Sequence, residues 1–165
     1  MNGNIKVDLV KTTPPQGARI YIVCIKFKQD RVWSKAVKAG GPDTPDDSNV
    51  WKVGDLYQPT GTKEIKEDVL LISYPLVGGN WRRALEWARG LGLKNTVPRK
   101  VFAIGEEHPN LNDRLGINQI RVVDTTFSPD DNRDVCYVWW HGRKRQVGLL
   151  QVGDFYGTTD WFAFC

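Results

Sequence analysis

Aromatic and basic residues gather in the last part of the chain, residues 134–165. This stretch holds three of the seven tryptophans and the tightest basic cluster of the sequence. Basic side chains neutralise phosphates, and aromatic rings on a sheet stack on unpaired bases. The pattern therefore predicts a nucleic-acid contact surface made of Trp139, Trp140, His141, Arg143, Lys144 and Arg145. A core strand followed by a solvated turn explains the same residues without any ligand.

A second basic group lies on a predicted helix over residues 81–91. Asn80 is a good N-cap, and apolar residues recur on one side at the 3.6-residue spacing of a helix. Arg82, Arg83 and Arg89 fall on the opposite side, where they could contact phosphates. A solvated helix face with an Arg82–Glu86 pair is the simpler explanation, and we favour it.

Two groups of residues could support catalysis. Glu106, Glu107 and His108 form the densest titratable trio, and a histidine beside carboxylates can be tuned for proton transfer. Cys136 with His141 could suggest a thiol nucleophile. A polar helix end and a buried structural cysteine account for these residues more simply, so a small enzyme is only the second alternative.

Motifs for cofactors and metals are missing from the sequence. Neither G-x-x-x-x-G-K-[ST] nor G-x-G-x-x-G occurs, which disfavours nucleotide binding by either route. His108 and His141 are the two histidines, and neither an H-x-x-x-H nor a C-x-x-C spacing occurs. We therefore expect no cofactor and no metal site.

The overall composition is that of a globular protein. The chain has 165 residues, a net charge of +4 and 41% hydrophobic residues, which predicts one mildly basic domain. The three cysteines are widely spaced and suggest reduced thiols. No apolar run approaches the ~20 residues of a membrane span, and no signal pattern opens the chain. We expect a cytoplasmic protein with no membrane contact.

The predicted elements are mainly strands. Periodicity and β-branched residues indicate strands at 5–10, 18–27, 50–57, 69–74 and 117–126, with 18–27 inside the sheet. A C-terminal antiparallel meander is predicted from strands at 135–140, 146–152 and 161–164. A second helix is expected at 99–107, with a strand at 100–104 as the alternative, and residues 31–39 fit a strand or a short helix. Residues 40–49 form an acidic loop, the best candidate for a mobile segment.

Strand alternation divides the first strand of this meander into two apolar faces. Val135, Tyr137 and Trp139 share one face, and Cys136, Val138 and Trp140 share the other. The strand is therefore either covered on both sides or leaves one aromatic face open to a partner. The sequence leaves open whether Trp139 or Trp140 faces outward.

These patterns predict a single α+β domain over residues 1–165. It would have an antiparallel or mixed sheet of about six to eight strands, with one or two helices on one face. The function we expect first is a small non-enzymatic protein that contacts nucleic acid or a nucleic-acid-handling complex. A protein-binding module or inhibitor with an exposed aromatic patch, such as a phage or mobile-element accessory protein, is the alternative. The sequence does not define the oligomeric state.

Overall fold

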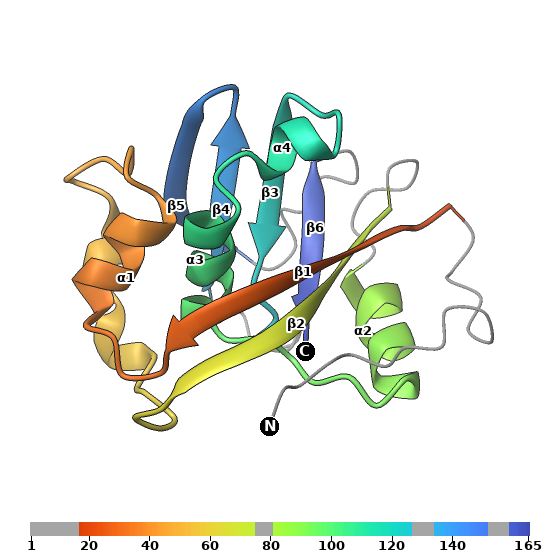
Figure 1. Ribbon diagram of the computed structural model, residues 1–165, viewed down its shortest axis with the longest axis horizontal. Coiled ribbons are helices and arrows are strands. Elements are labelled where there is room, and N and C mark those ends of the chain that lie inside the picture. The colour runs from red at the N-terminus through yellow and green to blue at the C-terminus, as the bar shows by residue number, and fades with distance from the viewer. Residues whose placement is uncertain (1–16, 75–80, 127–133, 152–158) are drawn as a thin grey trace.

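The chain folds around one mixed six-stranded sheet, which confirms the α+β class. The computed structural model describes residues 17–74, 81–126, 134–151 and 159–165. The strands, in chain order, are β1 (Arg19–Lys28), β2 (Glu64–Ser73), β3 (Gln119–Val123), β4 (Asp134–His141), β5 (Lys144–Gln151) and β6 (Asp160–Phe164). Their spatial order is β1-β2-β6-β3-β4-β5 (Figure 1). Among these described strands, only β3 and β6 pair in parallel.

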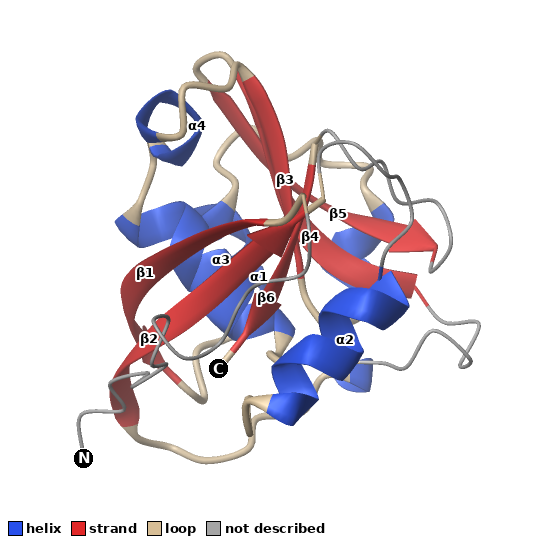
Figure 2. Ribbon diagram, turned by 90° about the vertical axis from the view of Figure 1, so that its right-hand side faces the viewer, coloured by secondary structure: helices blue, strands red, loops and turns tan. Residues whose placement is uncertain are grey.

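Helices cover both faces of this sheet. They are α1 (Trp33–Gly40), α2 (Trp81–Gly90), α3 (Pro98–Glu107) and the short α4 (Leu111–Arg114). α1 and α3 pack on one face and α2 on the other (Figure 2). The sequence patterns placed all helices on one face. This was wrong because α2 has its own apolar partners in β2 and β6, on the face away from α3.

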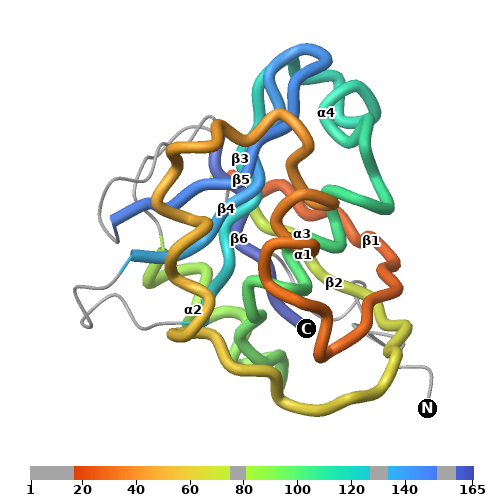
Figure 3. Tube along the Cα trace, turned by 90° about the vertical axis from the view of Figure 1, so that its left-hand side faces the viewer, coloured from red at the N-terminus to blue at the C-terminus, as the bar shows by residue number. Residues whose placement is uncertain are grey.

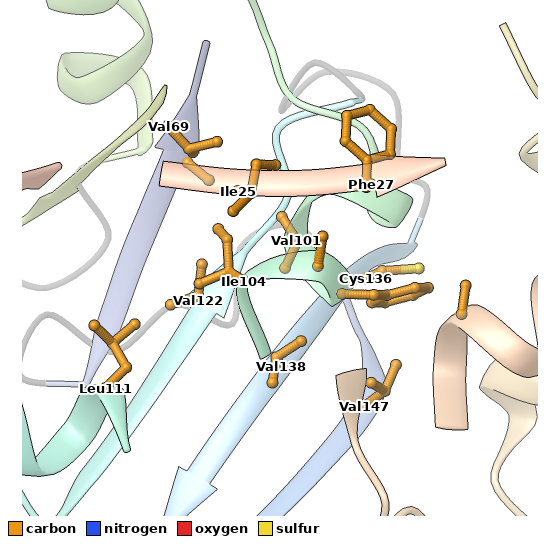
Figure 4. Close-up of a cluster of buried hydrophobic side chains, with 14 of the residues drawn as sticks. Ile25, Phe27, Val69, Val101, Ile104, Leu111, Val122, Cys136, Val138 and Val147 are labelled. Atoms are coloured by element: carbon orange, nitrogen blue, oxygen red, sulfur yellow. The ribbon is translucent and has the colours of Figure 1, made fainter. Parts of the chain in front are cut away.

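α3 forms the centre of the larger core. Pro98 occupies its first turn, where a missing N–H costs nothing. Val101 and Ile104 then point between β1 and the β3–β4 pair (Figure 4). These side chains are fully buried, so the helix holds the two ends of the strongly twisted sheet together.

Two predictions about where strands lie in the sheet are wrong, because these positions depend on which elements pack together in three dimensions. The predicted meander does not form: β4 and β5 make a hairpin, but β6 leaves it and inserts between β2 and β3. All five residues of β6 are buried, so the strand gains more in the middle of the sheet than at its edge. β1, expected inside the sheet, lies at the end of the described strand order and pairs there only with β2.

Other predictions fall into three groups. The strand at 50–57 is wrong: two short 3₁₀ segments, η1 (Asn49–Lys52) and η2 (Gly54–Leu56), occupy it. The segment 31–39, predicted as a strand or a short helix, contains most of the helix α1 (Trp33–Gly40), and both longer predicted helices are confirmed as α2 and α3. The predicted strand at 5–10 lies outside the described residues.

The acidic loop after α1 runs beside β5 (Figure 3). Asp43 N–H donates to the Arg145 carbonyl at 3.0 Å, and the Thr44 hydroxyl accepts from Val147 N–H at 2.8 Å. These bonds satisfy backbone groups at the β5 edge of the sheet, which would otherwise offer a site for strand pairing.

Two glycines allow α1 and α3 to approach closely. A Cβ added at Gly105 would meet the Gly40 carbonyl and lie 3.1 Å from the Gly40 Cα. A Cβ added at Gly40 would lie 2.8 Å from the Phe102 Cβ. The contact is between backbones, so no side-chain movement can relieve an added methyl group.

A buried carboxylate fixes the start of the connection between β3 and β4. Asp124 is fully buried and accepts hydrogen bonds from Thr126 N–H at 2.9 Å and Cys136 N–H at 2.5 Å. These hydrogen bonds stabilise the ionised form of Asp124. Burial disfavours that form more strongly, and the net effect raises the pKa of Asp124 to about 6.

We expect Gly105→Ala to destabilise the fold by about 2 kcal/mol, because overpacking a close backbone contact forces the helices apart. Thermal and urea unfolding measure this loss. Gly90→Ala is the matched control, since an added Cβ at Gly90 meets open space. It should be neutral or stabilising by up to ~1 kcal/mol. Equal effects of the two substitutions would contradict the close-contact argument.

The Asp124 contribution to stability should fall as pH rises from about 4 to 6. The folded pKa lies above the ordinary value of 3.8, so the folded state holds the proton more tightly across this window. The expected loss is on the order of 3 kcal/mol. Urea unfolding from pH 4 to 7 should show this slope in the wild type and not in Asp124→Asn. The exposed-loop control Asp46→Asn should keep the wild-type slope, and an unchanged slope in Asp124→Asn would refute the assignment.

Candidate nucleic-acid interface

Trp139 and Trp140 lie on opposite faces of β4. Trp140 is 1% exposed, and its indole N–H donates to the Pro109 carbonyl at 3.1 Å. Trp139 is half-buried and alternates onto the face away from α1 and α3. Of the two tryptophans, Trp139 is therefore the one that a ligand can reach.

An open hollow of about 280 Å³ lies beside Trp139. The strand register explains its walls, because Trp139 pairs with Arg121 on β3 and with Gln146 on β5. Directly paired residues share one face of a sheet. Tyr137 and Gln119 also line the hollow, and His141 pairs with Gln119 and Lys144 nearer the hairpin turn. Together these residues form a surface that we call the Trp139 face: Gln119, Arg121, Tyr137, Trp139, His141, Lys144 and Gln146.

Arg121 is held rigidly at the centre of the Trp139 face. Its Nε and Nη2 donate to the two carboxylate oxygens of Asp160 at 2.6 and 2.8 Å. Its guanidinium carbon lies 5.2 Å from the centre of the Tyr137 ring. The Asp160 side chain is almost completely buried, so this two-pronged pair is well shielded from water. Arg121 is thus a fixed planar group at the centre of this face, with its charge paired and its side chain 14% exposed.

Tyr137 lies flat across the neighbouring strand because β5 has a glycine there. A Cβ added at Gly148 would stand 2.5 Å from the Tyr137 hydroxyl oxygen. Burial of the ring raises the pKa of the Tyr137 phenol. The ring therefore forms part of the floor of the hollow.

The hairpin turn places polar groups at the edge of the Trp139 face. Gly142 has a φ of 59°, and its N–H and carbonyl bond to Asn118 and Asn112. His141 is exposed, and its ring centre lies 5.1 Å from that of Trp139. Arg143 lies in the turn and Lys144 begins β5, where it pairs with His141 at the edge of the Trp139 face; both side chains are exposed.

Arg145 has a structural contact instead. Its Nε donates to the Gly40 carbonyl at 2.8 Å, and an Nη2–Ala39 carbonyl contact lies at 3.5 Å. These carbonyls end α1, where a cation is favourable to the helix dipole. Burial lowers the pKa of Arg145, and Asp43 opposes that effect. Arg145 therefore points away from the Trp139 face and holds α1 to β5.

The predicted arginines of α2 lie on the same side of the sheet as Trp139. Arg82, Arg83 and Arg89 are exposed, and the helix beneath them covers β2 and β6. The Arg83 guanidinium carbon lies 5.5 Å from the centre of the Tyr74 ring. These side chains form a separate basic surface beside the Trp139 face.

Two members of the titratable trio, Glu106 and His108, make structural contacts, and the third, Glu107, is exposed. Glu106 pairs with Arg31 at 2.5 Å. The His108 Nε2 lies 2.7 Å from the Cys24 carbonyl oxygen, and its Nδ1 lies 3.4 Å from Arg114 Nη1. An imidazole occupied on both nitrogens has no proton acceptor to offer a substrate, so this geometry gives the enzyme alternative no support.

Sequence reasoning missed several residues of the Trp139 face. Tyr137 could have been found, since it stands two residues before Trp139 on the same strand. Arg121 and Gln146 come from neighbouring strands, and their position depends on register. Asp160 depends on the insertion of β6 beside β3, which no local pattern indicated.

Comparison with family models, curated proteins and solved structures finds no match for this chain. Across the part of the chain that the structure describes, no helix combines the length and apolar character needed to cross a bilayer. Within the same ranges, no group of three or more His, Cys, Asp or Glu side chains could hold a metal ion. The geometry of the Trp139 face is therefore the basis for assigning a function.

We expect Arg145→Ala to lower the free energy of unfolding by about 1–3 kcal/mol, because the α1 carbonyls lose a charged donor. Arg143→Ala, two residues away and exposed, should change it by less than ~0.5 kcal/mol. Urea unfolding of both variants measures the difference. A loss of similar size in the two variants would show that Arg145 has no special structural role.

Proposed function

We propose that this protein binds single-stranded nucleic acid on the Trp139 face. The observation that carries the proposal is the register of β3, β4 and β5. It places a half-exposed tryptophan between a fixed guanidinium and a polar amide, above an open hollow. Unpaired bases stack on such aromatic and guanidinium planes, with little dependence on base identity.

The polar groups around Trp139 suit a nucleotide. Gln119 and Gln146 carry amides, which both donate and accept hydrogen bonds and so match the edges of bases. Arg143 and Lys144 are exposed at the rim and supply positive charge for phosphates. The α2 arginines lie on the same side of the sheet and would extend the basic path along a longer strand.

A cytoplasmic setting fits this proposal. Cys24, Cys136 and Cys165 are all free, and reducing compartments keep thiols in this state. The alternative function, a protein-binding module with an aromatic interface, makes a different thermodynamic prediction. Its affinity would depend weakly on salt and would show a negative heat-capacity change.

We expect a fluorescently labelled oligonucleotide to bind with an affinity that falls with salt, measured by anisotropy at several salt concentrations. Trp139→Ala should weaken binding by about 10- to 100-fold, because one stacking contact is lost. Its salt slope should stay unchanged. Arg143→Ala/Lys144→Ala should lower the slope of log K against log salt by about 1.4, for two single-strand phosphate contacts.

The matched control is Lys35→Ala/Lys52→Ala, which removes two exposed lysines from α1 and η1, on the opposite face of the sheet. It should leave affinity and slope close to wild type. Duplex of the same length should bind more weakly, because paired bases cannot stack on Trp139. An absence of binding at low salt, or full affinity in Trp139→Ala, would overturn the proposal.

A further inference from the structure

A second cavity lies on the other side of the molecule from the Trp139 face. It has a volume of about 180 Å³ and opens between the end of β1, the segment after η2 and the start of α3. Most of its lining is apolar or aromatic. The residues that matter for its chemistry are Phe27, Leu56, Tyr57, Val97, Pro98 and Arg99.

The aromatic wall of this cavity is preformed. The Tyr57 ring stacks on Trp33, with centres 5.3 Å apart and planes within 4°. The Tyr57 hydroxyl donates to the Asp134 carbonyl at 3.1 Å, and the Trp33 indole donates to the Val50 carbonyl at 2.7 Å. A ligand that enters here meets a rigid surface, so binding loses little free energy in ordering these side chains.

Leu56 adds an exposed apolar surface at the rim. Its side chain is 67% exposed, which makes it the most exposed of the large hydrophobic residues that the structure describes. One exposed leucine is ordinary by itself. Here it borders a cavity with aromatic walls, so a bound apolar group would cover it together with the cavity lining.

Arg99 places a cation in the same lining. Its Nε donates to the Arg31 carbonyl at 3.0 Å and its Nη1 to the Tyr57 carbonyl at 2.5 Å, and both of these acceptors are neutral. Burial lowers the pKa of Arg99, and the charge of Asp30 opposes that effect. The positive end of the α3 dipole lies beside it. This end of the cavity therefore favours an anion.

We propose that this cavity binds a small apolar group that carries a carboxylate, with the ring or branched chain against Tyr57 and Phe27 and the carboxylate at Arg99. The cavity volume of about 180 Å³ is large enough for such a group, because a cavity of about 150 Å³ holds benzene. Two sources offer this chemistry: a free aryl or branched alkyl carboxylate, and the C-terminal residue of a peptide. The proposal is independent of nucleic-acid binding.

The test uses ¹H–¹⁵N NMR titration of the full chain with 3-phenylpropanoate and with its neutral amide. The carboxylate should give saturable shifts that cluster at residues 56–60 and 97–99. The amide should bind about tenfold or more weakly, since a charged hydrogen bond is replaced by a neutral one. N-acetyl-glycyl-phenylalanine and its C-terminal amide test the peptide source in the same way.

The charge is removed from the ligand and not from Arg99, because Arg99 also donates hydrogen bonds to two backbone carbonyls and its substitution would disturb the fold. On the protein side, Leu56→Asn should weaken binding about three- to tenfold through lost apolar contact. Val32→Asn, a change at another exposed apolar residue, should not. Three results would overturn the proposal: no saturable shifts up to about 10 mM ligand, equal affinity for acid and amide, or shifts that cluster elsewhere. None of them bears on the Trp139 face.

Discussion

The structure depends on the position of β6 between β2 and β3. Within the described sheet, this buried strand joins the antiparallel β1–β2 pair to the three strands β3, β4 and β5. Its first residue, Asp160, fixes Arg121 on the Trp139 face. Near its other end, the Ala163 carbonyl accepts from the hydroxyls of Thr96 and Thr125, at 3.1 and 2.7 Å. Both candidate sites are thus built on residues next to one strand.

This arrangement also explains why one part of the sheet surface is left accessible. α2 packs where β2 and β6 carry large apolar residues, such as Leu70 and Phe162. Farther along the same face, the paired positions hold Arg121, Trp139 and Gln146, whose polar groups do not fit under an apolar helix. The change from apolar to polar rows therefore sets where the helix cover ends and where a ligand can contact the sheet.

Local sequence patterns predicted which helices and strands form better than they predicted which of these elements lie beside one another. An apolar stripe at helical spacing predicted α2, the proline at its start predicted α3, and an apolar run predicted the buried part of β2; each of these is a local property. The position of β6 and the edge position of β1 depend on which surfaces pack together. Alternation in β4 separated Trp139 from Trp140, but both faces are apolar, so the buried one could be identified only from α3 and Pro109.

Basic residues that look alike in sequence carry different amounts of usable charge. Arg121 is paired with Asp160, while Arg145 donates to backbone carbonyls at the end of α1. A guanidinium bound in this way has already exchanged water for protein partners, so a phosphate gains less from it than from an exposed lysine. The net charge of +4 therefore overstates the electrostatic attraction available at the Trp139 face. Under the proposed function, stacking must supply most of the affinity there, and the rim cations Arg143 and Lys144 mainly orient the backbone of the ligand.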